Sequence, residues 1–212
     1  MIIAFHNTKG GVDSTTLAAH TCMRANARGL RVVALSCDPR QDLRRWLEPL
    51  QIPIADGRTV EIESIDADLV VADIAATVDL PAFSPTIWVL PICDRSSWEA
   101  ACDLSLRLRG SIVWVVNRES LTRYSVPAAL RSVVCVAPAI PLSDAIAAAE
   151  WTLASVWSDP STASSRGALA MRSFVDDLLA EAGLLPCEEL APRPGKVRAL
   201  GAPSAALASP TK

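Results

Sequence analysis

The stretch His6–Thr16, HNTKGGVDSTT, decides the fold of this chain. It follows an apolar run, Met1–Phe5, and opens a segment rich in Ala, Leu and Met. A glycine-rich turn between a strand and a helix is a setting in which backbone N–H groups and the helix N-terminus can hold a phosphate. Glycines let the backbone approach the anion closely. The stretch therefore predicts a phosphate-binding loop that leads into a helix.

Apolar runs of strand length recur along the chain on the C-terminal side of this loop. They are continuous rather than alternating, which is typical of strands buried on both faces of a parallel sheet. The predicted strands are Met1–Phe5, Arg31–Leu35, a short Ile52–Ile54, Leu69–Ala72, Thr86–Leu90, Ile112–Val116 and Val133–Val136.

Four segments between or after these runs have helical composition, and three of them are followed by glycine, a common helix C-cap. The predicted helices are Ser14–Arg28, Ser96–Arg109, Ser143–Val156 and Ser161–Ala182. Alternation of strands and helices predicts an α/β fold with a doubly wound, mostly parallel sheet. In such sheets ligands bind at the carboxyl ends of the strands.

The chain has 212 residues, which suits one α/β domain and is short for two. We expect a single domain over 1–185 and a disordered tail over 186–212, which is rich in Pro, Ala and Ser. Half of the residues are hydrophobic and the formal net charge is −3. These values exclude global disorder and a uniformly basic surface for nucleic acid, but they allow a local basic patch.

The location of the protein is predicted from its cysteines and its apolar runs. Six cysteines occur without a CxxC pair, and no run of about 18 apolar residues is present. Met1 leads directly into the first strand, without the pattern of a signal peptide. We therefore expect a cytoplasmic protein with reduced cysteines and no membrane-spanning helix.

The loop resembles the deviant Walker A motif of the ParA/MinD family, ATPases that position DNA and other cargo. The family's usual loop reads KGGxGK[ST]T, and the matching residues here are Lys9, Gly10, Gly11, Val12, Thr15 and Thr16. The resemblance implies a P-loop NTPase-like fold, ATP and Mg²⁺ as cofactors, and a homodimer. It also implies that Lys9 is a catalytic residue that reaches the partner's phosphates, and that the Thr15 hydroxyl holds Mg²⁺.

Further motifs of the family follow in the expected order, so that the resemblance covers about residues 1–183. VVALSCDPRQDL, residues 32–43, resembles the pattern hhhhDxDPQ, in which h is apolar, and implies that Asp38 positions the attacking water. ADLVVADIAAT, residues 67–77, resembles the Walker B strand and implies that Asp73 is linked to Mg²⁺. IVWVVNR resembles the strand after which Asn117 would face adenine.

The loop departs from the family pattern at Asp13 and Ser14, which stand where the family has glycine and lysine. The missing lysine would bond the β- and γ-phosphates, and such a charge-assisted hydrogen bond contributes roughly 1.5–3 kcal/mol. A carboxylate about 5 Å from a phosphate charge costs roughly 3 kcal/mol at an effective dielectric near 20, before screening. Ser36 also replaces the first aspartate of the second motif. The lost lysine and the added charge of Asp13 would together weaken ATP binding on the order of a thousandfold or more.

Two interpretations of catalysis stay open. Either Lys9 and Mg²⁺ compensate and the protein is a working ATPase, or the fold is kept and ATP binding and hydrolysis are impaired. The arithmetic favours impairment.

The predicted function is ATP-dependent segregation of DNA, a plasmid or another cargo by a dimer that works with a ParB-like or other small DNA-binding partner. The alternative is a non-hydrolysing ParA-like scaffold that regulates a partner, and a metabolic P-loop enzyme is a distant third. Non-specific DNA binding would use a local set of arginines. The candidates are Arg107, Arg109, Arg118, Arg123, Arg131, Arg166 and Arg172. Prolines at 192, 194 and 203 argue against a membrane-binding helix in the tail.

Overall fold

The computed structural model describes residues 1–118 and 139–185. Over these ranges the strands form one parallel sheet in the order β3-β2-β4-β1-β5-β6. The strands are β1 (Ile2–His6), β2 (Val32–Ser36), β3 (Ile54–Asp56), β4 (Leu69–Ile74), β5 (Ile87–Ile92) and β6 (Ser111–Val116). The predicted strand Val133–Val136 and the predicted tail 186–212 lie outside the described residues.

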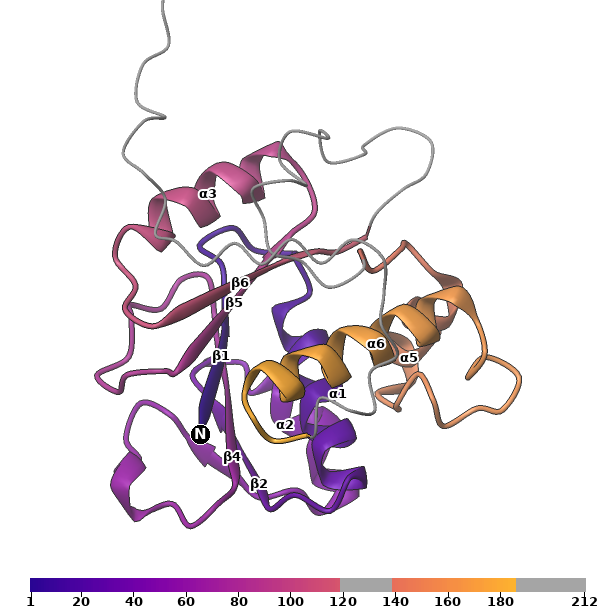
Figure 1. The fold of residues 1–212 in the computed structure, drawn as a ribbon, viewed down its shortest axis with the longest axis horizontal. Coiled ribbons are helices and arrows are strands. Elements are labelled where there is room, and N and C mark those ends of the chain that lie inside the picture. Colours follow the sequence, from indigo (N-terminus) through magenta and orange to yellow (C-terminus); the bar gives the residue numbers. More distant parts are fainter. Residues whose placement is uncertain (119–138, 186–212) are drawn as a thin grey trace, which may run out of the picture.

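The helices cover both faces of this sheet. They are α1 (Ser14–Ala27), α2 (Asp42–Leu47), α3 (Arg95–Ser105), α5 (Asp144–Thr152) and α6 (Arg166–Glu181), with short 3₁₀ turns η1 (Glu48–Leu50) and η2 (Ile62–Ser64). Figure 1 shows α1, α2, α5 and α6 gathered on one side of the sheet and α3 on the other. The structure thus confirms a doubly wound α/β domain.

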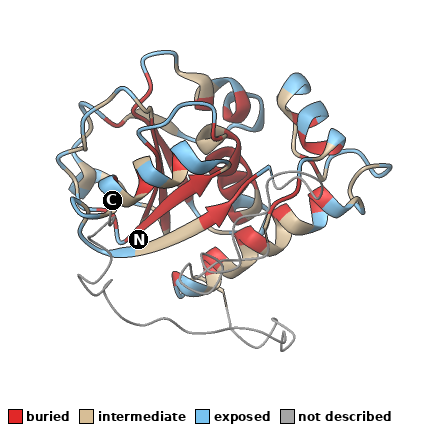
Figure 2. Ribbon diagram, turned by 90° about the horizontal axis from the view of Figure 1, so that it is seen from above, coloured by how far each residue is buried: buried red, intermediate tan, exposed pale blue. Residues whose placement is uncertain are grey.

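The strands are buried on both faces, as their continuous apolar sequences predict. In β1, Ile3 and Phe5 pack under the α1 and α6 side, whereas Ala4 packs on the opposite side with Leu35. The largest side chain that α6 adds to the core is Phe174, which is fully buried. Figure 2 shows the buried strands enclosed by helices whose outer surfaces are exposed. Within the described residues, no helix has both the length and the apolar character needed to cross a membrane.

Capping residues set helix boundaries that differ from the predicted ones. Helix α6 begins at Arg166 rather than at residue 161, because the Ser165 hydroxyl accepts the Ala168 N–H at 3.2 Å and caps the helix there. Helix α5 ends at Thr152 rather than at Val156, because Leu153 adopts a positive φ of 53°. The six-residue α2 was not predicted.

His20 joins α1 to the segment that follows α5. Its Nδ1 lies 2.8 Å from the Thr16 carbonyl oxygen, and its Nε2 accepts the Val156 N–H at 3.1 Å. The second contact needs an unprotonated Nε2, so the ring is neutral with its proton on Nδ1. The rings of Trp46 and Trp157 pack edge to face against the His20 ring, with 5.3 and 5.4 Å between ring centroids. Burial lowers the pKa of His20 from 6.5 to about 4.

The sheet order places the ends of three adjacent strands beside one another. β1 lies at the centre of the sheet between β4 and β5, and β2 lies on the far side of β4. Since all of these strands are parallel, the loops that follow β1, β2 and β4 open on the same edge of the sheet. That edge is where the predicted phosphate loop and both predicted aspartates lie.

Candidate nucleotide-binding site

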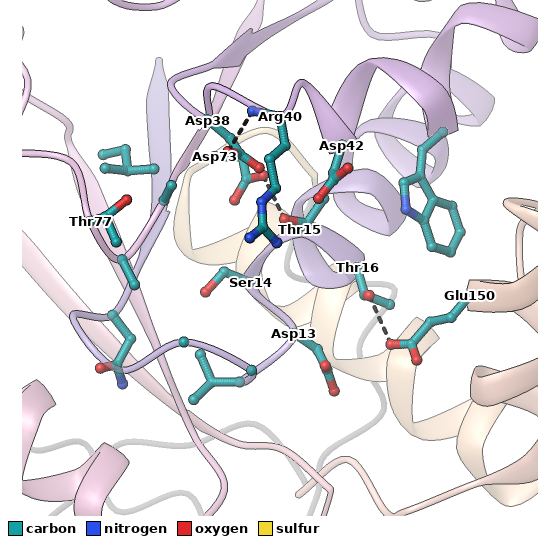
Figure 3. Close-up of a pocket in the computed structure, with 18 of the residues that line it drawn as sticks. Asp13, Ser14, Thr15, Thr16, Asp38, Arg40, Asp42, Asp73, Thr77 and Glu150 are labelled. Atoms are coloured by element: carbon teal, nitrogen blue, oxygen red, sulfur yellow. Dashed lines mark hydrogen bonds between the residues drawn. The ribbon is translucent and has the colours of Figure 1, made fainter.

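A cleft of about 550 Å³ opens at the carboxyl edge of the sheet. Its walls come from the β1–α1 loop with the start of α1, from the β2–α2 loop with α2, from the end of β4 and from α5 (Figure 3). The predicted residues that line it are Lys9, Gly10, Gly11, Val12, Asp13, Ser14, Thr15, Thr16, Asp38 and Asp73. The structure therefore brings all the predicted site residues except Asn117 to one cleft.

The amide of Asn7 fixes the start of the β1–α1 loop. Its Nδ2 donates to the carbonyl oxygens of Pro91 at 2.7 Å and Ser97 at 3.1 Å, which belong to β5 and α3. Its Oδ1 accepts the Lys9 N–H at 2.9 Å. Asn7 is almost fully buried, so these bonds are shielded from water and hold the loop in place.

The loop leaves space above its glycines. A Cβ added at Gly10 or Gly11 would meet no atom within 4 Å, and Gly11 has a φ of +75°. The conformation of Gly11 therefore favours glycine, and the open space above both residues is free for a ligand. Backbone donors around such a space, followed by the start of α1, fit a phosphate group. Val12 is buried and anchors the far side of the loop.

Thr15 and Asp73 form the pair that was predicted for Mg²⁺. The Thr15 hydroxyl donates to Asp73 Oδ2 at 2.7 Å. Burial, helped by the charges of Asp38 and Asp42, raises the pKa of Asp73 to about 7, although the hydrogen bond from Thr15 opposes the shift. A carboxylate that is buried beside two other acids is chemically suited to a cation.

Within the described parts of the chain, no three His, Cys, Asp or Glu side chains are grouped to hold a metal by themselves. A hydroxyl and one carboxylate fit an Mg²⁺ ion that takes its remaining ligands from water and phosphate.

Asp38 lies two residues after the end of β2 and lines the same cleft. Its Oδ1 accepts the Arg40 N–H at 2.9 Å, which fixes the carboxylate, and the residue is largely buried. The backbone is tied to the neighbouring strand, because the Cys37 N–H donates to the Asp73 carbonyl oxygen at 2.9 Å. The Ser36 hydroxyl is buried and has no hydrogen-bond partner among the described residues.

The Asp13 carboxylate is bound by two partners that sequence reasoning did not assign to it. Arg118 forms a two-pronged ion pair with its carboxylate, and Asn117 Nδ2 donates to Asp13 Oδ2 at 3.1 Å. Asp13 has a φ of 62°, in the left-handed region that the family's glycine also tolerates. The ion pair offsets the negative charge that Asp13 brings to the loop.

Asn117 does not line the cleft, although it was expected to face adenine. Its Nδ2 donates to the Val12 carbonyl oxygen at 3.1 Å as well as to Asp13. Both hydrogens of this amide are therefore used to hold the loop.

Several residues that line the cleft were not singled out from the sequence. Glu150 of α5 accepts the Thr16 hydroxyl at 2.9 Å, and burial raises its pKa. Arg40, Asp42 and Trp46 come from the β2–α2 loop and α2. Arg40 and Asp42 carried a signal, because both belong to the stretch that resembles the second family motif.

The geometry defines an α/β protein in which a glycine loop, a hydroxyl–carboxylate pair and a second aspartate line one cleft. No family model matches the sequence, and no curated protein sequence matches it. Solved structures do match. MinD from Pyrococcus horikoshii in complex with Mg-ADP superposes with a TM-score of 0.68 at 16% identity, over 86% of this chain and 97% of that one.

Two further solved structures have the same fold with somewhat lower TM-scores. A putative plasmid partition protein from Borrelia burgdorferi bound to AMPPNP gives a TM-score of 0.64 at 12% identity, over 85% of this chain and 98% of that one. The MinC:MinD cell division protein complex of Aquifex aeolicus gives 0.62 at 16% identity, over 84% and 96%. The chain thus has the fold of the ParA/MinD ATPases.

Proposed function

We propose that this protein is a ParA-like partition protein that binds ATP and Mg²⁺ in the cleft and segregates DNA, a plasmid or another cargo. The observation that supports this most directly is the convergence of Lys9, Thr15, Asp38 and Asp73 on one cleft, behind a loop with open space above its glycines. The fold supports the same proposal, because MinD and plasmid partition proteins share it.

Each residue has a role that its position favours. The loop amides bind phosphate, and Thr15 with Asp73 holds the metal. Asp38 orients the attacking water from its fixed position just after β2. Lys9 is exposed at the mouth of the cleft, with its Nζ 3.3 Å from the Gly10 carbonyl oxygen, so it is accessible to a partner protomer. When bound, Mg-ATP supplies the electrophilic phosphorus and a metal charge to polarise it.

Hydrolysis is proposed to be impaired, because Ser14 lacks the charge that a lysine would bring to the β- and γ-phosphates. Asp13 contributes less to this impairment than its charge alone suggests, since Arg118 neutralises it. Binding is therefore affected mainly through position 14.

The proposed partners are a second copy of this chain and a ParB-like or other small DNA-binding protein, in the cytoplasm. A precedent for a partner is the MinC:MinD complex, one chain of which has this fold. Non-specific DNA binding is proposed through exposed arginines such as Arg107, Arg109 and Arg166. Arg118 pairs with Asp13 and Arg172 lies over the Trp157 ring, whereas Arg123 and Arg131 lie outside the described residues.

Isothermal titration with ATP and Mg²⁺ tests nucleotide binding. We expect weak binding by the wild type and binding at least about tenfold tighter after the double substitution Asp13→Gly with Ser14→Lys, because a charge-assisted hydrogen bond is restored. Thr15→Ala in the double variant is the matched control and should lose the Mg²⁺ dependence. If neither the wild type nor the double variant binds ATP, the cleft is not a nucleotide site.

DNA binding is tested by a gel shift at low and high salt, in the presence and absence of ATP. We expect a shift at low salt that high salt removes, as phosphate contacts require. A complete lack of shift at low salt in every nucleotide state contradicts this part of the proposal.

The second candidate is a non-hydrolysing scaffold that regulates a partner through the same fold. Ser14 favours it, because the residue removes a phosphate ligand while the rest of the cleft is kept. Phosphate release in the presence of DNA and the cognate partner separates the two. Stimulated release supports an ATPase, and release at the background rate of a Thr15→Ala control supports a scaffold.

A further inference from the structure

Among the described residues, three basic side chains line the cleft, and two of them already have partners. The Lys9 ammonium donates to the Gly10 carbonyl oxygen, and Arg45 pairs with Asp42 at 3.4 Å. The guanidinium of Arg40 has no hydrogen-bond or ion-pair partner within the described part of the chain. A cation of this kind at a ligand cleft is available to an anion.

The backbone places Arg40 close to the metal pair. Its N–H is bonded to Asp38 Oδ1, so the residue is fixed directly beside the proposed water-orienting carboxylate. Figure 3 shows its side chain extending from the β2–α2 loop into the cleft, toward Ser14 and Thr15. A neighbouring loop therefore brings a positive charge to the part of the cleft where the phosphate loop lacks one.

We propose that Arg40 binds the β- or γ-phosphate of the nucleotide in place of the lysine that is missing at position 14. This inference rests on the proposed nucleotide-binding function and names the residue that supplies part of the affinity lost at position 14. The planar guanidinium presents parallel N–H donors to two phosphate oxygens, which a single ammonium cannot do. Arg40 also stands where the motif quoted above has glutamine, so the compensating cation came from a second site in the same cleft.

Binding of the fluorescent analogue mant-ATP with Mg²⁺, followed by anisotropy, tests the proposal in four proteins: wild type, Arg40→Gln, Ser14→Lys and the double variant. We expect Arg40→Gln to weaken binding about 10- to 100-fold in the wild type, the size of one charge-assisted hydrogen bond. In the Ser14→Lys background the same change should cost less than about threefold, because the two cations serve the same phosphates.

A matched control removes a charge from the same cleft. Arg45→Gln deletes a cation that is already paired with Asp42, so it should change binding by less than about threefold. Thermal stabilisation by AMP provides a second readout: Arg40→Gln should reduce stabilisation by ATP and leave that by AMP unchanged, since AMP has no β- or γ-phosphate. Arg40 is exposed, and equal circular dichroism spectra would show that the variants are folded.

The outcomes separate this inference from the function on which it rests. Equal binding by wild type and Arg40→Gln, or an equal loss in Arg45→Gln, overturns the role of Arg40 and leaves the nucleotide site standing. Binding by Ser14→Lys but not by the wild type at millimolar nucleotide overturns it as well. If neither the wild type nor Ser14→Lys binds mant-ATP, the proposed function itself fails.

Discussion

Protonation of His20 should destabilise the folded protein in mildly acidic solution. The folded-state pKa is about 4 and the ordinary value is 6.5. Between pH 6.5 and about pH 4, His20 is therefore mostly protonated in the unfolded chain and mostly neutral in the folded chain. The contribution of neutral His20 to the free energy of unfolding is fully present above pH 6.5 and decreases as the pH falls toward 4. The total loss is about 3 kcal/mol. Between pH 7 and pH 5 the expected loss is about 2 kcal/mol.

The structural reason is the contact at Nε2. The Val156 N–H points at this nitrogen, so a second proton there would place two donors against each other in a buried site between Trp46 and Trp157. Protonation of His20 should therefore replace the hydrogen bond from the Val156 N–H to Nε2 with a repulsive contact between two donors.

Urea unfolding at a series of pH values measures the effect, with His20→Gln as the comparison. Carboxylates and His6 titrate in both proteins, so the difference between the two curves belongs to His20. We expect the variant to be less stable at pH 7 but to lose about 2 kcal/mol less than the wild type on going to pH 5. The chain has two histidines, so their ring protons can also be followed separately by NMR. Parallel curves, or a His20 pKa of 6 or higher in the folded protein, would refute the reasoning.

Three further results are expected. Arg118→Met should free the Asp13 carboxylate and weaken Mg-ATP binding about tenfold or more, and adding Asp13→Asn should restore it; titration calorimetry would measure both, and a loss without rescue would contradict the neutralising role. Asp73→Asn should remove the stabilisation that Mg²⁺ gives in the presence of ATP at pH 8; melting curves decide, and a variant still stabilised by Mg²⁺ would count against the Thr15–Asp73 pair as its site. Phe174→Ala should lower the free energy of unfolding, measured by urea denaturation, by about 3–5 kcal/mol, because it removes a fully buried ring. A loss below about 1 kcal/mol would mean that α6 is not packed as described.

The sheet could be predicted from the sequence because its strands are buried on both faces. The runs around Ile3, Val33, Val71, Val89 and Val115 each became a strand of the parallel sheet, with ends displaced by one or two residues. The displacement mattered at β4, which continues to Ile74 and so includes Asp73 within the strand.

The helix ends were harder to predict, because they depend on single contacts. The Ser165 cap sets the start of α6, and the positive φ of Leu153 sets the end of α5. The residues just outside these two ends have a composition that also suits a helix, so the sequence does not indicate where the helices stop. Helix α2 has six residues, which is too short for an apolar period to be visible in the sequence.

The site was predicted where its residues are close in the sequence or belong to a family motif. The approach of Thr15 to Asp73 follows from the parallel order of β1 and β4, and the structure places them 2.7 Å apart. The ion pair of Asp13 with Arg118 joins residues 105 positions apart, and no local pattern indicates it. The same holds for the guanidinium of Arg40, which has no partner among residues 1–118 and 139–185 and whose direction depends on the packing of the β2–α2 loop.

The bond between Asp13 and Arg118 makes the two positions depend on each other in evolution. Restoring glycine at 13 alone would release a guanidinium beside the loop, and losing the arginine alone would leave an unbalanced acid there. The two steps are not equivalent, because an exposed guanidinium tolerates the loss of its partner whereas a freed carboxylate would repel phosphate. Exchange of Asp13 for glycine can therefore precede the loss of Arg118, whereas the reverse order passes through a loop that carries an unbalanced acid.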